Sequence, residues 1–433
     1  MKKIALISHG CAKNLVDSEL ILGFLKQGGY EITLNEDETN IVIVNTCSFI
    51  SDAERESVHS ILEMVEAGKK VIVTGCLSQK HAEELKTAIP EICAVVGTTD
   101  FSKIVDVIKQ VEDGIFVNEV SKDPEYIYPE NVERQQITMG ASSYIKIADG
   151  CNYRCGYCVI PYLRGNYHSR KIEDIVCEAK NLVKKGVTEI ILVAQDTTGY
   201  GVDIYNKPML SELLKELNKI EGLGWIRVMY AYPTQMKDEL LKIINDCEKV
   251  VKYVDIPLQH SHPEMLKLMS RPSFDYRPMI ENIRKLVPNV SIRTAFVVGY
   301  PGETEEHFEH LCEFVRDMKF DKMGVFCYSR EKGTPSYSMK PQVPKRVAKA
   351  RWKKLMEIQQ EISKKRNAGF VGKLVPCIIE CFSDEGEVIA RTQYDAPEID
   401  GVVNIKTDKY LVPGDIELVR IVDSTEYDLV GEL

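Results

Sequence analysis

The sequence lacks the features of membrane and secreted proteins. It has no run of about 18 apolar residues, and the apolar stretch after its first three residues is too short for a signal peptide. It also has no internal repeat. Thirteen cysteines without a secretion signal indicate a reducing compartment, where thiols bind metals or stay buried. We therefore expect a cytoplasmic protein with no membrane partner and no disulfide framework.

Positive charge is scarce and unevenly distributed. The formal net charge is −10, which argues against non-specific binding of nucleic acid. Residues 369–433 hold five Lys/Arg against fourteen Asp/Glu, whereas residues 344–367 hold nine Lys/Arg against two Glu. This basic segment is a predicted helix whose expected apolar face consists of Val347, Trp352, Leu355, Ile358 and Ile362. The contrast indicates a partner with a basic protein surface and RNA beside it.

A cysteine motif in the middle of the chain lacks a fourth ligand. Cys151, Cys155 and Cys158 have the spacing C-x3-C-x2-C, and the next eighteen residues contain no cysteine. Thiolates at this spacing can hold an iron–sulfur cluster, which normally takes four ligands, so one iron would stay open for a small molecule. The alternatives are three unrelated core thiols or a zinc site, for which His168 is the only near additional ligand.

Three further cysteines follow predicted buried strands. Cys11, Cys47 and Cys76 each come just after an apolar run. The carboxyl ends of parallel strands lie along one edge of a sheet, so these thiols are expected to meet there. Three convergent thiolates again favour a cluster with one open iron, and the alternative is three unrelated cysteines in loops.

Alternating strand and helix patterns predict an α/β fold. Residues 1–120 indicate an open, mostly parallel sheet, and residues 121–136 are expected to form a linker. Residues 137–367 contain six βα units, which predict an incomplete TIM-like barrel with its chemistry at the C-terminal strand ends. Residues 369–433 predict a small antiparallel β-barrel with strands at 374–380, 387–392, 402–406 and 416–422.

The order of these features resembles the methylthiotransferase family of radical S-adenosylmethionine (SAM) enzymes over nearly the whole chain. The segments that carry the likeness are Gly10–Asn14, Asn45–Cys47, Thr74–Cys76, Gly150–Cys158, Pro161 and Arg164-Gly165, with a C-terminal segment that looks like a TRAM domain. The resemblance implies two 4Fe–4S clusters. The ligands would be Cys11, Cys47 and Cys76 for an auxiliary cluster that manages sulfur, and Cys151, Cys155 and Cys158 for the radical SAM cluster.

Polar and glycine residues after several barrel strands are candidates for binding SAM. They are Gln195, Gly299 and Glu303, and glycine allows a close backbone approach to a ligand. A turn-forming role is the alternative for each glycine. Tyr157, directly before Cys158, matches the aromatic position of the radical SAM motif.

Two branches of the family differ in their substrate. One modifies an adenosine of tRNA (MiaB-like), and the other, the RimO type, modifies the β-carbon of an aspartate on the twelfth protein of the small ribosomal subunit. Residues 193–201 and 396–401 resemble the RimO type, and the acidic C-terminal segment would repel a tRNA backbone. The alternatives are the tRNA branch and a non-catalytic iron–sulfur protein that binds RNA.

The resemblance to the RimO type also implies the cofactors and partners of the reaction. The enzyme would be a transferase that consumes two SAM molecules, one as methyl donor and one as radical source. Its partner would be the 30S subunit, with ribosomal RNA next to the target protein. Flavodoxin or ferredoxin would supply the electron.

Overall fold

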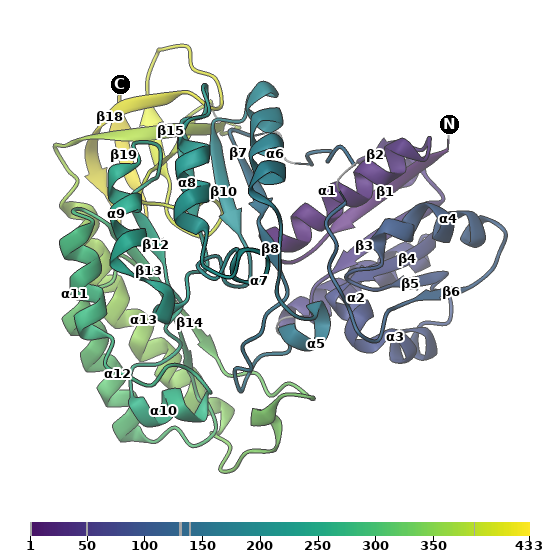
Figure 1. The fold of residues 1–433 in the computed structure, drawn as a ribbon, viewed down its shortest axis with the longest axis horizontal. Coiled ribbons are helices and arrows are strands. Elements are labelled where there is room, and N and C mark those ends of the chain that lie inside the picture. Colours follow the sequence, from purple (N-terminus) through teal and green to yellow (C-terminus); the bar gives the residue numbers. More distant parts are fainter. Residues whose placement is uncertain (1, 49–50, 130–131, 138–139, 385) are drawn as a thin grey trace. The chain divides into compact units, whose positions relative to one another are not determined.

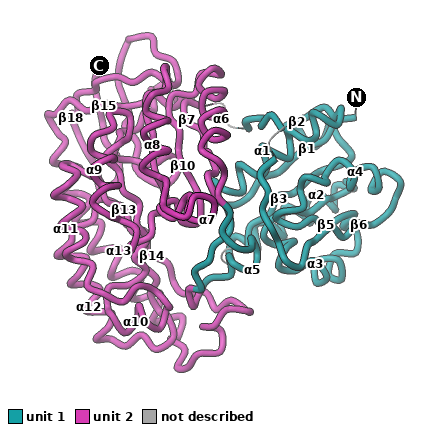
Figure 2. The backbone as a smooth tube through the Cα atoms, in the orientation of Figure 1, with its two compact units in different colours: residues 1–139, 149–154, 158–168 teal, residues 140–148, 155–157, 169–433 magenta. Residues whose placement is uncertain are grey.

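The computed structural model describes residues 2–48, 51–129, 132–137, 140–384 and 386–433. Figure 2 shows two compact units, one of residues 1–139, 149–154 and 158–168 and the other of residues 140–148, 155–157 and 169–433. The predicted linker, barrel and tail include residues 130–131, 138–139 and 385, respectively, which lie outside the described residues. The predicted domain boundaries stay predictions.

The N-terminal unit is built on a parallel sheet of six strands in the order β2-β1-β3-β4-β5-β6 (Figure 1). Its strands are β1 (Lys3–Ser8), β2 (Glu31–Thr33), β3 (Ile41–Thr46), β4 (Lys70–Gly75), β5 (Ala94–Val96) and β6 (Val117–Glu119). Its helices are α1 (Ala12–Gln27), α2 (Ser51–Glu66), α3 (Cys76–Ala88) and α4 (Ile104–Glu112). Every residue of β3 is buried, which explains its continuous apolar run. The predicted parallel sheet is confirmed.

Six parallel strands form an open barrel in the second unit. They are β7 (Ser142–Lys146), β10 (Glu189–Val193), β11 (Trp225–Val228), β12 (Tyr253–Asp255), β13 (Ser291–Val298) and β14 (Lys322–Cys327). They form two three-stranded sheets, β7-β10-β11 and β12-β13-β14, which an isolated bridge between Ile226 and Val250 joins. The six predicted βα units are therefore confirmed.

A helix follows each barrel strand. These helices are α6 (Ile172–Lys184), α8 (Leu210–Asn218), α9 (Asp238–Asp246), α11 (Arg277–Leu286), α12 (Glu305–Met318) and α13 (Lys345–Ala368). The shorter elements are β8 (Ala148–Asp149), α5 (Ile160–Arg164), β9 (His168–Ser169), α7 (Val202–Tyr205) and α10 (Pro263–Leu268). Within the described ranges, no helix has the length and apolar character needed to cross a membrane.

The predicted apolar face of the basic helix α13 is only partly buried. Leu355 is buried, Val347, Ile358 and Ile362 are half-buried, and Trp352 is 38% exposed. The buried stripe of α13 instead consists of Ala348, Arg351, Leu355, Gln359, Ser363 and Asn367. Polar side chains can occupy it because partners satisfy them: Gln359 donates to the carbonyl of Phe320 at 2.9 Å. The apolar pattern missed this stripe because it does not score satisfied polar groups.

The C-terminal segment forms a closed five-stranded barrel. Its strands are β15 (Leu374–Phe382), β16 (Val388–Thr392), β17 (Val403–Lys406), β18 (Ile416–Ser424) and β19 (Leu429–Glu432), in the order β15-β16-β17-β19-β18. The predicted small barrel is confirmed, with two differences. The sequence pattern missed β19, and β17 pairs with β19 in parallel although every other pair is antiparallel.

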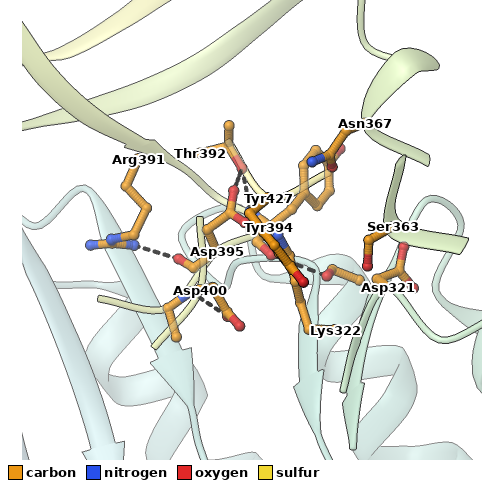
Figure 3. Close-up of polar contacts among 12 residues, drawn as sticks. Asp321, Lys322, Ser363, Asn367, Arg391, Thr392, Tyr394, Asp395, Asp400 and Tyr427 are labelled. Atoms are coloured by element: carbon orange, nitrogen blue, oxygen red, sulfur yellow. Dashed lines mark hydrogen bonds and ion pairs between the residues drawn. The ribbon is translucent and has the colours of Figure 1, made fainter. Parts of the chain in front are cut away.

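The loop of residues 393–400, between β16 and β17 of this small barrel, covers the N-terminal ends of strands of the six-stranded barrel. Figure 3 shows Lys322, the first residue of β14, paired with Asp395 of this loop. Asp400 accepts a hydrogen bond from Tyr253, the first residue of β12, at 2.7 Å. Ser291, which begins β13, donates to the carbonyl of Tyr394 at 3.1 Å. The loop therefore covers the starts of these three strands, and chemistry is expected at the opposite, C-terminal strand ends.

A buried ion cluster joins the same two barrels. Glu189 of β10 pairs with Arg391 of β16 and, at 2.9 Å, with Arg227 of β11, and all three side chains are at most 1% exposed. Burial would raise the pKa of Glu189, but the charges of Arg391 and Arg227 outweigh it and lower this pKa to about 2.

We predict that Glu189→Gln lowers the free energy of unfolding of this unit by about 3–5 kcal/mol at neutral pH, because two buried guanidinium groups lose their counter-charge. Urea unfolding followed by tryptophan fluorescence measures the effect, since Trp225 and Trp352, the chain's two tryptophans, both lie in this unit. The difference in the free energy of unfolding between the variant and wild type should narrow as pH falls below about 4.5 towards 2, where Glu189 itself becomes protonated. Glu216→Gln, at an exposed pair with Lys219, is the control. Equal midpoints for the Glu189 variant and wild type would contradict the prediction.

Candidate functional site

The structure brings Cys11, Cys47 and Cys76 to one edge of the N-terminal sheet. Cys11 caps the start of α1 just after β1, Cys47 follows β3, and Cys76 begins α3 directly after β4. These strands are neighbours, and their last residues pair in register: Ser8 with Asn45, and Thr46 with Gly75. The thiols converge because the strands end together.

Two glycines allow the chain to crowd at this edge. Gly10 has φ +99°, and a Cβ atom there would lie 2.9 Å from Cys47 Cβ and 3.1 Å from its Sγ. Gly75 has φ +94°, and a Cβ atom there would lie 2.5 Å from the carbonyl oxygen of Thr46. Any side chain at either position would push the cysteine-bearing turns apart.

Asn14 and Asn45 brace the turns that carry the thiols, a role that the sequence pattern does not predict. The Asn14 side chain donates to the carbonyls of His9 at 3.0 Å and Thr46 at 2.8 Å. Asn45 in turn donates to the Asn14 carbonyl at 3.0 Å. The available signal was Asn45, a polar residue inside the otherwise apolar run of β3, because a buried amide must find partners.

The three thiols affect one another electrostatically. Burial raises the pKa of Cys76 to about 11; Arg164 opposes this shift, whereas charge on Cys11 and Cys47 adds to it. Desolvation also opposes ionisation of Cys11, but the positive charges of Lys13 and Arg164 outweigh it and lower its pKa. Such coupling requires short distances between the thiols.

This donor set fits a 4Fe–4S cluster better than a hard metal ion. Its three ligand atoms are soft sulfurs at a partly buried sheet edge, where Cys47 and Cys76 are each 8% exposed. Three thiols can hold three irons of such a cluster and leave the fourth open.

The C-x3-C-x2-C loop is divided between the two units. Cys151 and Cys158 belong to the N-terminal unit and Cys155 to the second. Gly150 has φ +74°, and a Cβ atom there would lie 1.9 Å from the carbonyl oxygen of Asn166, so the Cys151 turn requires glycine. In the second unit, Cys155 Sγ lies 4.0 Å from Arg271 Nη1.

The four residues predicted to contact SAM all lie in the second unit. Tyr157 packs edge-on against Tyr300, with 6.5 Å between ring centroids, and Gln195 follows the end of β10. Gly299 follows β13, and a Cβ atom there would lie 2.4 Å from Ala348 Cβ, so this glycine admits helix α13. Contact with SAM stays a prediction for each of these residues.

Glu303 holds the turn after β13 through contacts within the protein. Its Oε2 atom accepts from Arg351 at 2.7 Å and from the Gly299 amide, and its Oε1 atom lies 3.3 Å from His260 Nε2. These contacts favour a structural role for Glu303 at the strand end.

A histidine cluster in the same unit has metal-like spacing but the wrong tautomer. Ligand atoms of His262, Glu264 and His307 lie within 4.8 Å of one another. His262 Nδ1 accepts from the Glu264 amide at 3.3 Å, and His307 Nδ1 accepts from the Thr304 amide at 3.2 Å. Each neutral ring therefore carries its proton on Nε2, the atom a metal would need. These histidines serve as helix caps.

Three family models match the chain: "Uncharacterized protein family UPF0004" at residues 3–97, "Radical SAM superfamily" at 145–315 and "TRAM domain" at 371–433. A relative from Thermoanaerobacter sp. (strain X514), named ribosomal protein uS12 methylthiotransferase RimO, is 51% identical over 100% of both chains. A relative of the same name from Caldanaerobacter subterraneus subsp. tengcongensis is 49% identical over 100% of both chains. The radical SAM methyltransferase TsrM of Kitasatospora setae is similar in fold, with TM-score 0.58, 15% identity and coverage of 78% of this chain and 77% of its own.

We predict that iodoacetamide modifies Cys11 faster than Cys76 in the metal-free protein at neutral pH. Cys11 is exposed and has a lowered pKa, whereas Cys76 is buried with a pKa of about 11, so the rates should differ by about tenfold or more. Time-resolved peptide mass spectrometry measures both sites. The buried Cys377, with a pKa of about 12, should stay unmodified as an internal control. Faster modification of Cys76 would contradict the prediction.

Proposed function

Because this chain belongs to the family of ribosomal protein uS12 methylthiotransferases (RimO), we propose that it attaches a methylthio group to the β-carbon of an aspartate of uS12. Identity of about half over the full length of both chains supports transfer of the reaction from the relatives. The convergence of Cys11, Cys47 and Cys76 beside one another is the structural observation that carries the proposal, because sulfur insertion needs a second iron–sulfur site.

The six cysteines are the proposed ligands of two 4Fe–4S clusters. Cys11, Cys47 and Cys76 would hold the auxiliary cluster, and Cys151, Cys155 and Cys158 the cluster that binds SAM. When bound, these cofactors supply the sulfur and the radical, which no side-chain acid or base can supply for an unactivated carbon. The protein contributes the fixed positions of the thiols, which Gly10, Asn14 and Gly150 impose.

For SAM itself we propose Tyr157 and Gln195 as contacts. Both lie in the barrel unit, and Gln195 comes just after the C-terminal end of β10, where the chemistry of such barrels takes place. Gly299 and Glu303 would shape the neighbouring turn, since the hydrogen bond between them fixes it.

The substrate side of the proposal depends on charge. The segment 369–433 carries five Lys/Arg and fourteen Asp/Glu, so it favours a basic ribosomal protein and repels an RNA backbone. The tRNA branch is therefore not favoured. We propose that the enzyme meets uS12 on the 30S subunit in the cytoplasm and receives its electron from a flavodoxin or ferredoxin.

We predict that two cysteine variants separate the steps of the reaction. Cys155→Ala should abolish release of deoxyadenosine from SAM, whereas Cys47→Ala should retain that release but form no methylthio product. Anaerobically reconstituted protein, SAM and 30S subunits are incubated, and both products are quantified by mass spectrometry. Cys93→Ala, at a half-buried thiol directly before the start of β5, is the matched control and should behave as wild type. Methylthiolated uS12 from the Cys47 variant would refute the proposed division of roles.

We also predict that 30S subunits are modified and tRNA is not. The two are offered separately at the same concentration, and product formation is measured on each. Replacing the acidic residues Glu417 and Asp423 by Lys should reduce modification of 30S subunits at low salt more than at high salt, because salt screens the lost attraction. Product on tRNA alone would place the enzyme in the other branch.

A further inference from the structure

One buried charge in the N-terminal unit lies beside the proposed auxiliary site. Arg164 ends the short helix α5, six positions after Cys158, and is only 2% exposed. Removing a guanidinium group from water costs several kcal/mol unless its partners are well placed. Its contacts therefore indicate what the fold requires at this point.

The guanidinium group of Arg164 joins three segments that carry the proposed ligands. Its Nη1 atom donates to Asp17 Oδ2 at 2.9 Å and to Asp149 Oδ2 at 2.8 Å. Its Nη2 atom donates to Asn14 Oδ1 at 2.6 Å and lies 3.9 Å from Cys76 Sγ. Asp17 and Asn14 belong to α1, which Cys11 caps, and Asp149 lies two residues before Cys151.

Helix α5 also packs against Cys76 independently of this charge. Val159 and Leu163 form a small buried cluster with Cys76, and Thr98 donates a hydrogen bond to the Leu163 carbonyl. Apolar packing therefore already places the helix. The guanidinium group adds directional contacts. Its Nη1 atom faces two carboxylates, and its Nη2 atom faces an amide oxygen and the Cys76 sulfur.

We propose that Arg164 is a positioning residue that sets the reduction potential of the iron–sulfur centre on Cys11, Cys47 and Cys76. The inference rests on the proposed function, because it assumes that these thiols bind a cluster. Hydrogen bonds to sulfur and local charge both tune the potential of such clusters. A reduced cluster carries one more negative charge than an oxidised one, so a buried cation 3.9 Å from a ligand sulfur favours reduction.

The same geometry predicts opposite shifts of the reduction potential when Arg164 and its partner Asp17 are neutralised in turn. Loss of the Arg164 charge should lower the potential, because the added electron is less well stabilised. Loss of the Asp17 charge should raise it, because Arg164 is then less neutralised. A residue that only supported the fold would not shift the potential in opposite directions when it and its partner are neutralised in turn.

The test is a redox titration of the full-length protein, reconstituted anaerobically and followed by EPR. Every variant carries Cys155→Ala, so that only the auxiliary centre contributes to the signal. We expect a more negative potential for Arg164→Gln, a more positive one for Asp17→Asn, and a value nearer the background for Arg164→Lys, which keeps the charge but loses the fork. Arg170→Gln is the matched control, since Arg170 is a buried, paired arginine of the other unit; it should leave the potential unchanged.

Iron content separates the outcomes. The inference is overturned if the iron content is normal but the potentials do not move. It is also overturned if the potentials of Arg164→Gln and Asp17→Asn move in the same direction. Both results leave the proposed function intact. If Arg164→Gln fails to fold, Asp17→Asn decides: a potential that is unmoved or more negative than the background overturns the inference. A Cys155→Ala background that takes up no iron refutes the auxiliary ligand assignment, and this inference with it.

Discussion

Parallel strands that end at one edge are the constraint on which both halves of this protein depend. In the N-terminal sheet, β1, β3 and β4 stop in register, so thiols far apart in the sequence come together without a local motif. The central barrel follows the same rule, because its predicted SAM-binding residues follow strand ends. The glycines of the N-terminal edge follow from this constraint, since three turns must share a small space.

The small C-terminal barrel covers the opposite, N-terminal ends of strands of the six-stranded barrel. A barrel of this kind has two ends, and polar groups at the strand starts need partners where the barrel would otherwise be open. Here the loop of residues 393–400 covers that end, with Lys322, Tyr253 and Ser291 as its partners. Part of the segment that resembles the RimO type, residues 396–401, thus belongs to a structural plug. Its resemblance therefore has an architectural reason, since Asp400 and its neighbours contact the starts of the barrel strands.

The sequence predicted what periodicity and spacing can encode. Buried parallel strands are continuous apolar runs, so the six βα units and the strand-end cysteines could be located from residues alone. Polar side chains that are buried because a distant partner satisfies them could not be located. Such residues are Asn14, Arg164 and Gln359 in the buried stripe of α13, since their partners lie on elements far away in the chain. Strand β19 was missed because Gly431 interrupts its short apolar run, and its parallel pairing with β17 depends on closure of the barrel.

Buried ion pairs recur at the joints between elements, and this recurrence has a physical reason. Arg164 meets Asp17 and Asp149, Arg227 and Arg391 meet Glu189, and Arg351 meets Glu303. Such pairs add little net stability, because the Coulomb attraction mostly offsets desolvation, yet any arrangement that separates them leaves a charge uncompensated. They therefore act on specificity: a shifted helix or strand would bury a lone charge, whereas a shifted apolar contact costs much less. The chemistry of this protein needs thiols held in position on several elements. The free-energy cost of a lone buried charge fixes those elements more strictly than burial of additional apolar area would.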